Sequence, residues 1–159
     1  MASACSTGSW RTILRADFYH LGRSAVEQVF LRIAQRTLAD GGRLLVVSAD
    51  DALAGRLDAF LWSHEPTAFL PHGRSGQGDE ATQPVLIAPT PDAANGARFI
   101  ALVDGVWRDE ALGFERAFYL FDDRTIEEAR AVWRSLGDRE GIERQFWKQD
   151  EEGRWRQQA

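Results

Sequence analysis

The stretch Gly41-Gly42-Arg43-Leu44-Leu45-Val46-Val47-Ser48-Ala49-Asp50 decides the fold class of this chain. Its centre, Leu44-Leu45-Val46-Val47, is apolar at four consecutive positions, and such a run predicts a strand that is covered on both faces. A strand of this kind is typical of a sheet with helices on each side. The glycine pair before it is a typical helix stop, and the aspartate after it is a typical helix start.

Amphipathic segments precede and follow this strand. Ser24-Ala25-Val26-Glu27 has the form of a capping box, and it predicts a helix that runs to the glycine pair. The apolar face of that helix consists of Val26, Val29, Phe30, Ile33 and Leu38. A second helix is predicted from near Asp50 to a point before Pro66, with Leu53, Leu57, Phe60 and Leu61 on its buried stripe.

Further apolar segments predict strands at residues 16–21, 85–88, 99–103 and 117–121. The connection from 89 to 98 contains the turn residues Pro89, Pro91 and Asn95-Gly96 and is too short for a full helix, which leaves open an antiparallel pairing of the strands it joins. Thr125-Ile126-Glu127-Glu128 predicts a capped third helix, with Ile126, Ala129, Trp133 and Leu136 inward. Strands that alternate with helices indicate an α/β fold with a mostly parallel central sheet flanked by helices.

Length and composition predict one domain. With 159 residues, 44% of them hydrophobic, the chain is long enough to bury a core without disulfides or metals. We expect residues 1–15 to form a flexible extension and residues 16–159 to form the domain. The charged C-terminal segment 141–159 contains Phe146, Trp147 and Trp155, so we expect it to pack partly against that domain.

Cysteine content and hydropathy predict a soluble cytoplasmic protein. Cys5 is the single cysteine, which rules out an intrachain disulfide and favours a reducing compartment. The first fifteen residues lack the apolar core of a signal peptide, and no apolar run approaches the roughly 20 residues of a membrane span. The net charge of −5 disfavours binding to a phosphate backbone, so any contact with DNA is expected to be indirect.

Few residues carry the pattern of a catalytic or cofactor site. The loop His72-Gly73-Arg74-Ser75-Gly76-Gln77-Gly78 lacks the Gly-Lys-Ser/Thr ending of a P-loop. The histidines His20, His64 and His72 are scattered, so we expect no metal and no cofactor. Asp50-Asp51 follows a strand end, where α/β enzymes often keep catalytic carboxylates, although helix capping explains it adequately. The alternative function is a nucleotide-binding enzyme that uses Asp50, His20 and the Gly73–Gly78 loop.

Two groups of side chains suggest binding instead of catalysis. Arg130 and Arg134 flank Trp133 at helical spacing, a pattern that suits an acidic, aromatic peptide. From the spacing alone, however, a core tryptophan with two surface arginines is the favoured interpretation. Trp62, followed by Phe69-Leu70-Pro71, places costly apolar side chains after a helix end, where they must dock on their own domain or on another chain.

Taken in order, these features resemble the chi subunit family of bacterial DNA polymerase III, small non-catalytic components of the clamp-loader assembly. The resemblance covers residues 16–147. It is carried by Asp17-Phe18-Tyr19-His20-Leu21, Ala25-Val26-Glu27-Gln28, Arg56-Leu57-Asp58, Leu61-Trp62, the segment from Ser63 to Phe69-Leu70-Pro71-His72-Gly73, Pro84-Val85-Leu86-Ile87 and the segment from Arg130 to Arg134. The block from Trp62 to Gly73 is its specific part, whereas the apolar strands are not specific.

The resemblance implies a three-layer Rossmann-like fold with no nucleotide site, and an adaptor with no catalytic activity of its own. Such an adaptor joins the clamp loader to single-stranded-DNA-binding protein, whose acidic C-terminal tail ends in an apolar residue and a free carboxylate. By position, Arg130, Trp133 and Arg134 would form the tail-binding surface. Guanidinium groups bind carboxylates through paired hydrogen bonds, and an indole can cover an apolar side chain.

The same resemblance assigns Trp62, Phe69, Pro71 and His72 to the surface that receives the psi subunit or another clamp-loader component. The chain also departs from the family pattern. Ile126 stands where some relatives carry lysine, so part of the cationic rim of the tail site is missing. The leading extension and the segment Phe146–Trp155 differ from the better-known members.

Overall fold

The computed structural model describes residues 14–22, 25–63 and 71–158 of the chain. The elements follow in the order β1 (Leu14–His20), α2 (Val26–Ala39), β2 (Leu44–Val47), α3 (Asp51–Ser63), β3 (His72–Arg74), η2 (Glu80–Thr82), β4 (Val85–Ala88), β5 (Phe99–Leu102), η3 (Asp109–Gly113), β6 (Arg116–Phe121), α4 (Ile126–Gly137), β7 (Ile142–Gln149) and β8 (Trp155–Gln158). In this part of the chain, no helix is long and apolar enough to cross a membrane.

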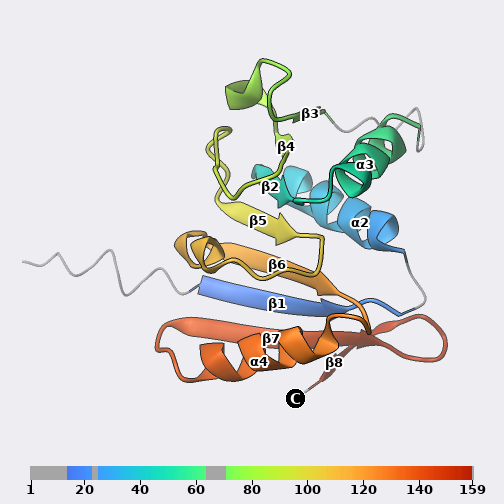
Figure 1. The fold of residues 1–159 in the computed structure, drawn as a ribbon, viewed down its shortest axis with the longest axis vertical. Helices are drawn as coiled ribbons and strands as arrows, with labels where there is room; N and C mark the ends of the chain where they lie inside the picture. Colours follow the sequence, from blue (N-terminus) through green and yellow to red (C-terminus); the bar gives the residue numbers. More distant parts are fainter. Residues whose placement is uncertain (1–13, 23–24, 64–70, 159) are drawn as a thin grey trace, which may run out of the picture.

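The eight strands found among the described residues form one sheet, in the order β3-β4-β2-β5-β6-β1-β7-β8 (Figure 1). Every neighbouring pair is parallel except β7 and β8, which form an antiparallel hairpin. Strands β2 and β4 are apolar at all four positions, lie inside the sheet and are buried throughout. The predicted α/β class with a mostly parallel sheet is therefore confirmed.

Alternate residues of each strand point to opposite faces, which gives the sheet two cores. On the first face, Leu44 and Val46 of β2 pack with the apolar stripes of α2 and α3. On the second face, Leu45 and Val47 belong to a cluster that includes Ala129 and Leu136 of α4. Helices on both sides of the sheet complete the three layers.

The helices cover the sheet unevenly. On the first face α2 and α3 lie against β2, β3 and β4, whereas α4 lies against β7 on the second face. At the β1–β7 end of the first face, Tyr19 and Trp155 are only half-buried at the margin of the core. This end of the sheet therefore keeps exposed aromatic surface between α2 and β8.

The connection between β4 and β5 corrects one alternative from the sequence. These two strands are not paired with each other; each pairs in parallel with β2, which lies between them. No helix is needed to connect β4 to β5, because the strands are short. The connecting chain must run roughly 13 Å back along β4 and 10 Å across two strand spacings, and ten extended residues reach about 33 Å. Asn95 is buried in this crossover and donates to the carbonyls of Leu44 and Gln83.

Helix starts agree only partly with the sequence. Asp50 caps α3 as predicted, since its carboxylate accepts the backbone N–H groups of Ala52 and Leu53 at 3.0 and 3.3 Å. The predicted capping box at Thr125 does not form. Its hydroxyl lies inside the turn that begins at Asp122, 3.4 Å from the Asp122 backbone N–H. The other predicted cap, Ser24, lies outside the described residues, but the N-cap of α2 is Ala25 and has no side-chain cap hydrogen bond, so the predicted start at Ser24 is wrong.

The C-terminal segment does more than pack against the domain. Residues 142–149 form β7, which pairs in parallel with β1, and residues 155–158 add β8 at the edge. The sequence pattern missed β7 because its residues are charged or half-buried instead of uniformly apolar. β1 also begins at Leu14, two residues earlier than expected, and His72–Arg74, expected to be a loop, forms the edge strand β3.

Candidate functional site

A pocket of about 410 Å³ lies between α4 and the end of β7. It is lined by His20, Ile126, Arg130, Trp133, Phe146, Lys148 and Gln158. Positions 126, 130 and 133 of α4 are four and three residues apart, so they share one face of the helix. The parallel register of β1 with β7 places His20 opposite Lys148 and thereby adds both strands to the same pocket.

The pocket has an aromatic floor that is fixed by ring contacts. The Trp133 indole meets Phe18 and Phe146 edge to face, with ring centroids 5.2 and 5.6 Å apart. The guanidinium carbon of Arg144 lies 4.1 Å from the centroid of the Trp133 ring, and the same side chain donates to the Trp133 carbonyl. A half-buried indole held on three sides offers a rigid apolar surface to a ligand.

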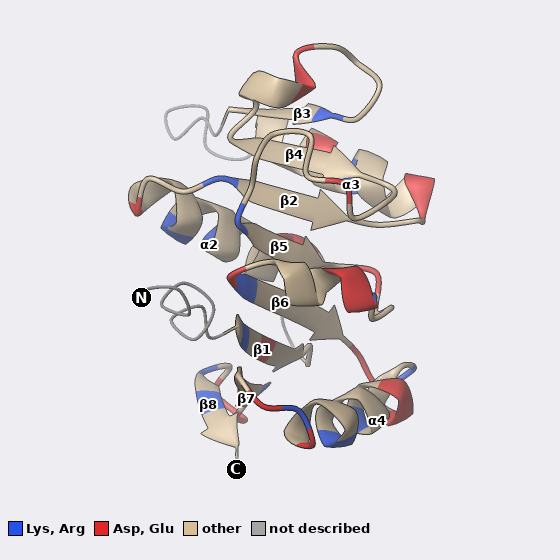
Figure 2. Ribbon diagram, turned by 90° about the vertical axis from the view of Figure 1, so that its left-hand side faces the viewer, with Lys and Arg blue, Asp and Glu red and all other residues tan. Residues whose placement is uncertain are grey.

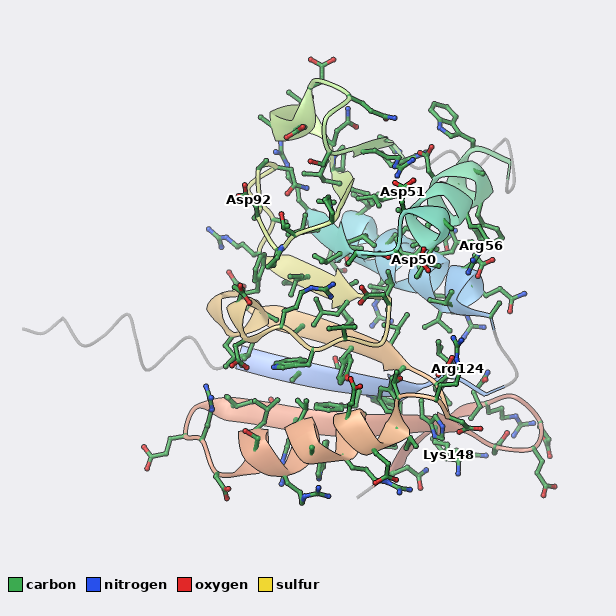
Figure 3. The ribbon with its side chains drawn as sticks, viewed as in Figure 1. Asp50, Asp51, Arg56, Asp92, Arg124 and Lys148 are labelled. Atoms are coloured by element: carbon green, nitrogen blue, oxygen red, sulfur yellow. The ribbon has the colours of Figure 1, made fainter. Side chains whose placement is uncertain are left out.

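Two cations lie at the rim of this floor. Arg130 is 57% exposed and pairs with Glu127 one turn earlier at 2.8 Å. Lys148 is exposed, and Figure 3 shows it close to the first turn of α4. His20 faces the pocket from β1 and holds the exposed Asp123 carboxylate at 2.7 Å. The arrangement is an apolar floor with positive charge beside it.

The sequence-predicted tail residues are only partly brought together. Arg130 and Trp133 line the same pocket, whereas Arg134 is exposed outside it and makes no ion pair with the described residues. Arg144, not Arg130 or Arg134, covers the indole. Lys148 and His20 were missed, because their proximity depends on the pairing of β7 with β1.

The second predicted surface lies at the opposite end of the sheet, beside the edge strand β3. Trp62 is 60% exposed at the end of α3, and Pro71 is exposed next to the strand. The His72 side chain is fully buried and contacts the Asp58 carboxylate at 2.9 Å, with its ring 5.0 Å from the Trp62 indole. His72 thus supports Trp62 from behind. Phe69 lies outside the described residues.

The strand-end carboxylates of the alternative function line a pocket of about 580 Å³. The acidic residues that line this pocket are Asp50, Asp104 and Asp122, and its cations are Arg56 and Arg124. Figure 3 labels Asp50, Arg56 and Arg124. Asp104 already accepts hydrogen bonds from Arg108 and from the backbone N–H of Ala49. Each aspartate therefore has a structural partner or a cap, and together they repel a phosphate.

The other members of the alternative site are far apart. β3, which opens the Gly73–Gly78 loop, is the first strand of the sheet and β1, which carries His20, is the sixth. Five strand spacings separate them by about 24 Å. Within the loop, the Gly76 backbone N–H already donates to the Glu80 carboxylate. Among the described residues, no cluster of histidine, cysteine, aspartate and glutamate has the form of a metal site.

The fold and the pocket define a three-layer α/β protein with an apolar groove and a cationic rim. Its sequence matches the family described as DNA polymerase III chi subunit, HolC, over residues 14–144. The chain belongs to this family of DNA replication proteins.

Curated relatives agree with that assignment. The chain is 40% identical over 67 residues to DNA polymerase III subunit chi of Escherichia coli K12. The aligned region covers 42% of this chain and 46% of the relative. It is 36% identical over 70 residues to the subunit of the same name from Pseudomonas aeruginosa, with 42% and 49% covered. The Haemophilus influenzae subunit is 29% identical over 76 residues, with 46% and 53% covered. The chain spans about half the length of the curated relatives it matches.

Proposed function

We propose that this protein is a non-catalytic adaptor of the replication machinery, which binds the acidic C-terminal tail of single-stranded-DNA-binding protein in the groove between α4 and β7. One observation carries the proposal: Arg130 and Lys148 lie beside the apolar floor of Trp133, Ile126 and Phe146 in one pocket. A chain end that combines an apolar side chain with a carboxylate requires both features at the same place.

Each side chain has a distinct role in the proposed complex. The terminal apolar residue packs on the half-buried Trp133 and Phe146 rings, whose positions are already fixed. Arg130 donates two N–H groups to the terminal carboxylate, and Lys148 supplies a second positive charge from β7. Lys148 partly compensates for Ile126, which stands where some relatives carry lysine. Arg134, one turn away and outside the pocket, contributes through longer-range attraction.

A second part of the proposal concerns the link to the clamp loader. We propose that the exposed indole of Trp62, with Pro71 and Phe69, receives the psi subunit or another clamp-loader component. His72 keeps Trp62 in place through their ring contact and does not itself reach the partner. The two surfaces lie at opposite ends of the sheet, so one adaptor can hold both partners at once.

Titration of the tail peptide tests the first part directly. We expect Arg130→Ala to cost about 1.5–3 kcal/mol of tail affinity, the scale of hydrogen bonds to a charged group, without loss of folding. Fluorescence anisotropy with a labelled terminal peptide measures this effect, and the peptide without its last residue should bind far more weakly. The attraction should also weaken as salt rises.

Arg134→Ala is the matched control, since it removes the same charge from the same helix outside the pocket. It should weaken binding clearly less than Arg130→Ala does. Equal dissociation constants for wild type and Arg130→Ala would refute the proposed tail site. For the second surface, loss of clamp-loader proteins from a pull-down with Phe69→Asp, while tail binding stays intact, is the expected result.

A further inference from the structure

A third pocket, of about 350 Å³, lies on the first face of the sheet between α2 and β8. It opens where the helices leave the β1–β7 end of the sheet uncovered. Its lining residues are Arg15, Tyr19, Val29, Arg32, Ile33, Arg36, Arg116, Phe118, Trp147 and Trp155. The proposed tail site uses none of these residues and lies on the other face, because adjacent strand residues point to opposite sides.

Aromatic rings form the floor and one wall of this pocket. Tyr19 and Trp147 are register partners on β1 and β7, and their rings lie nearly parallel at 14° with centroids 6.4 Å apart. Trp155 of β8 stands at 89° to the Tyr19 ring, with centroids 5.3 Å apart. All three rings are half-buried, so each keeps a face or an edge open. A flat floor with a perpendicular wall suits a planar ring.

The floor also contains two arginines that are held in place by a buried carboxylate. Asp17 has no exposed side-chain surface and binds Arg116 at 2.6 Å and Arg15 at 3.2 Å. Arg15 further donates to Gln145 at 2.7 Å, and the Trp147 indole N–H lies 3.4 Å from Asp17. The guanidinium groups are therefore positioned before any ligand arrives, while their side chains remain 34% and 30% exposed for Arg15 and Arg116.

Two more arginines line the opposite wall. Arg32 and Arg36 are exposed on one stripe of α2, and neither makes an ion pair with the described residues. Figure 2 shows the basic positions of α2 on the same side of the molecule as those at the starts of β1 and β6. Burial, and after it the Asp17 carboxylate, raises the pKa of the Tyr19 hydroxyl. Arg116, Arg15 and Arg36 act in the opposite direction, so these three arginines lie within electrostatic reach of that hydroxyl.

Charge and shape together favour one occupant. Four arginines line the pocket, whereas the carboxylate nearest to them, Asp17, is fully buried beneath the floor, so the pocket carries a local excess of positive charge although the whole chain is acidic. Aromatic platforms beside guanidinium groups are the usual means of binding bases and phosphates of a single strand. An acidic peptide would satisfy the arginines but leave the flat floor without a planar partner. We propose that this pocket binds single-stranded DNA, one base against Tyr19, Trp147 and Trp155 and the adjoining phosphates against Arg32 and Arg36.

The test is a titration of the full-length protein with a fluorescently labelled 15-nucleotide oligothymidylate at several salt concentrations. Trp155→Ala should weaken binding about 5- to 150-fold, the range for one stacked base. Arg32→Ala and Arg36→Ala should each reduce the slope of log Kd against log salt by about 0.7, the value for one phosphate contact on a single strand. Duplex DNA of equal length should bind more weakly, and free thymidine monophosphate should not compete at equimolar concentration.

Arg124→Ala is the matched control, because it removes an exposed arginine that does not line this pocket and should leave the oligonucleotide affinity unchanged. The acidic tail peptide should bind Arg32→Ala and Arg36→Ala as well as wild type, and Arg130→Ala should retain oligonucleotide binding. These crossed measurements separate a failure of this pocket from a failure of the proposed tail site. No oligonucleotide binding, equal binding by all variants, efficient competition by the mononucleotide, or loss of peptide binding in Arg36→Ala would overturn the proposal.

Discussion

Arg130, the residue proposed to bind the tail carboxylate, makes only a weak ion pair within its own helix. In the free protein its guanidinium pairs with Glu127 of the same helix, and both side chains are largely exposed. An exposed pair at this spacing contributes only a few tenths of a kcal/mol, because water screens it. The proposed tail carboxylate can therefore replace Glu127 at little cost.

Glu127→Ala provides the corresponding prediction. We expect this variant to bind the tail peptide more tightly, by a few tenths of a kcal/mol, since Arg130 no longer has an internal competitor. The acidic tail also loses a repulsive neighbour. Fluorescence anisotropy measures the change, with Glu128→Ala as a control for the loss of one negative charge in the same turn. Weaker binding by Glu127→Ala than by wild type would contradict a direct bond between Arg130 and the tail.

Trp133 shows which part of the site could be predicted at the residue scale. Its helical phase correctly predicted a position on the core side of α4. The sequence did not predict that Arg144, eleven residues later, would stack on it. A Cβ atom at Gly137 would lie 2.7 Å from the Arg144 guanidinium carbon, so the missing side chain leaves room for this contact. This contact forms because β7 pairs with β1 and lies against α4, and no local sequence pattern predicts it.

At the scale of elements, α3 is the clearest case of a locally encoded boundary. It begins where Asp50 accepts two free backbone N–H groups, and the sequence is sufficient to predict this start. α4 begins without such a bond, because the Thr125 hydroxyl turns back toward Asp122. A Ser/Thr-x-x-Glu pattern is therefore insufficient when the preceding residues form a tight turn of their own.

The contribution of the Asp50 cap to stability can be tested by comparing alanine variants of Asp50 and of the adjacent Asp51. We expect Asp50→Ala to lower the free energy of unfolding by about 1 kcal/mol, the typical contribution of an N-cap. Asp51→Ala is the matched control, because its 95% exposed carboxylate makes only a surface pair with Arg74 and should cost about 0–1 kcal/mol. Urea unfolding followed by circular dichroism measures both. Equal losses in the two variants would contradict the capping role.

β7 and β8 mark the limit of prediction for elements. Buried strands such as Leu44–Val47 and Val85–Ala88 have uniformly apolar sequences, and the pattern predicts their bounds correctly. β7 has half-buried positions on both faces and carries charges among its aromatic residues. β7 is a strand because it pairs with the distant β1, and this pairing cannot be predicted from its local sequence. The pocket between α4 and β7 lies at this junction, so its lining could only be predicted in part.

At the scale of the whole molecule, Asp104 links the ends of two strands. Its carboxylate binds Arg108 at 2.8 Å and the backbone N–H of Ala49 at 2.9 Å, and thereby ties the loop after β2 to the turn after β5. Burial acts to raise the pKa of Asp104, but hydrogen bonds from Arg108 and Ala49 outweigh it, so the pKa is lowered. This part of an α/β fold often binds phosphate, and here it has a structural role.

The lowered pKa has a defined effect on stability. A carboxylate whose pKa is lower in the folded state stabilises the protein above its unfolded pKa of about 3.9, and this contribution is lost as the pH falls through the folded pKa. We expect Asp104→Asn to cost about 1.5–3 kcal/mol at pH 7 and to flatten the fall of stability below pH 4. Urea unfolding between pH 2 and pH 7 tests this. If the free energy of unfolding of Asp104→Asn falls below pH 4 as steeply as that of wild type, Asp104 is not a principal cause of the fall.

The position of β1 within the sheet has a consequence for how the chain folds during synthesis. β1 pairs with β6 and β7, which follow it by roughly 100 residues or more, and loop closure of that length slows the formation of such contacts. The opening strand therefore leaves the ribosome long before its neighbours exist. Its Phe18 and Tyr19 rings therefore lack their sheet neighbours until β6 and β7 have been synthesised, and apolar surface exposed in this way favours aggregation.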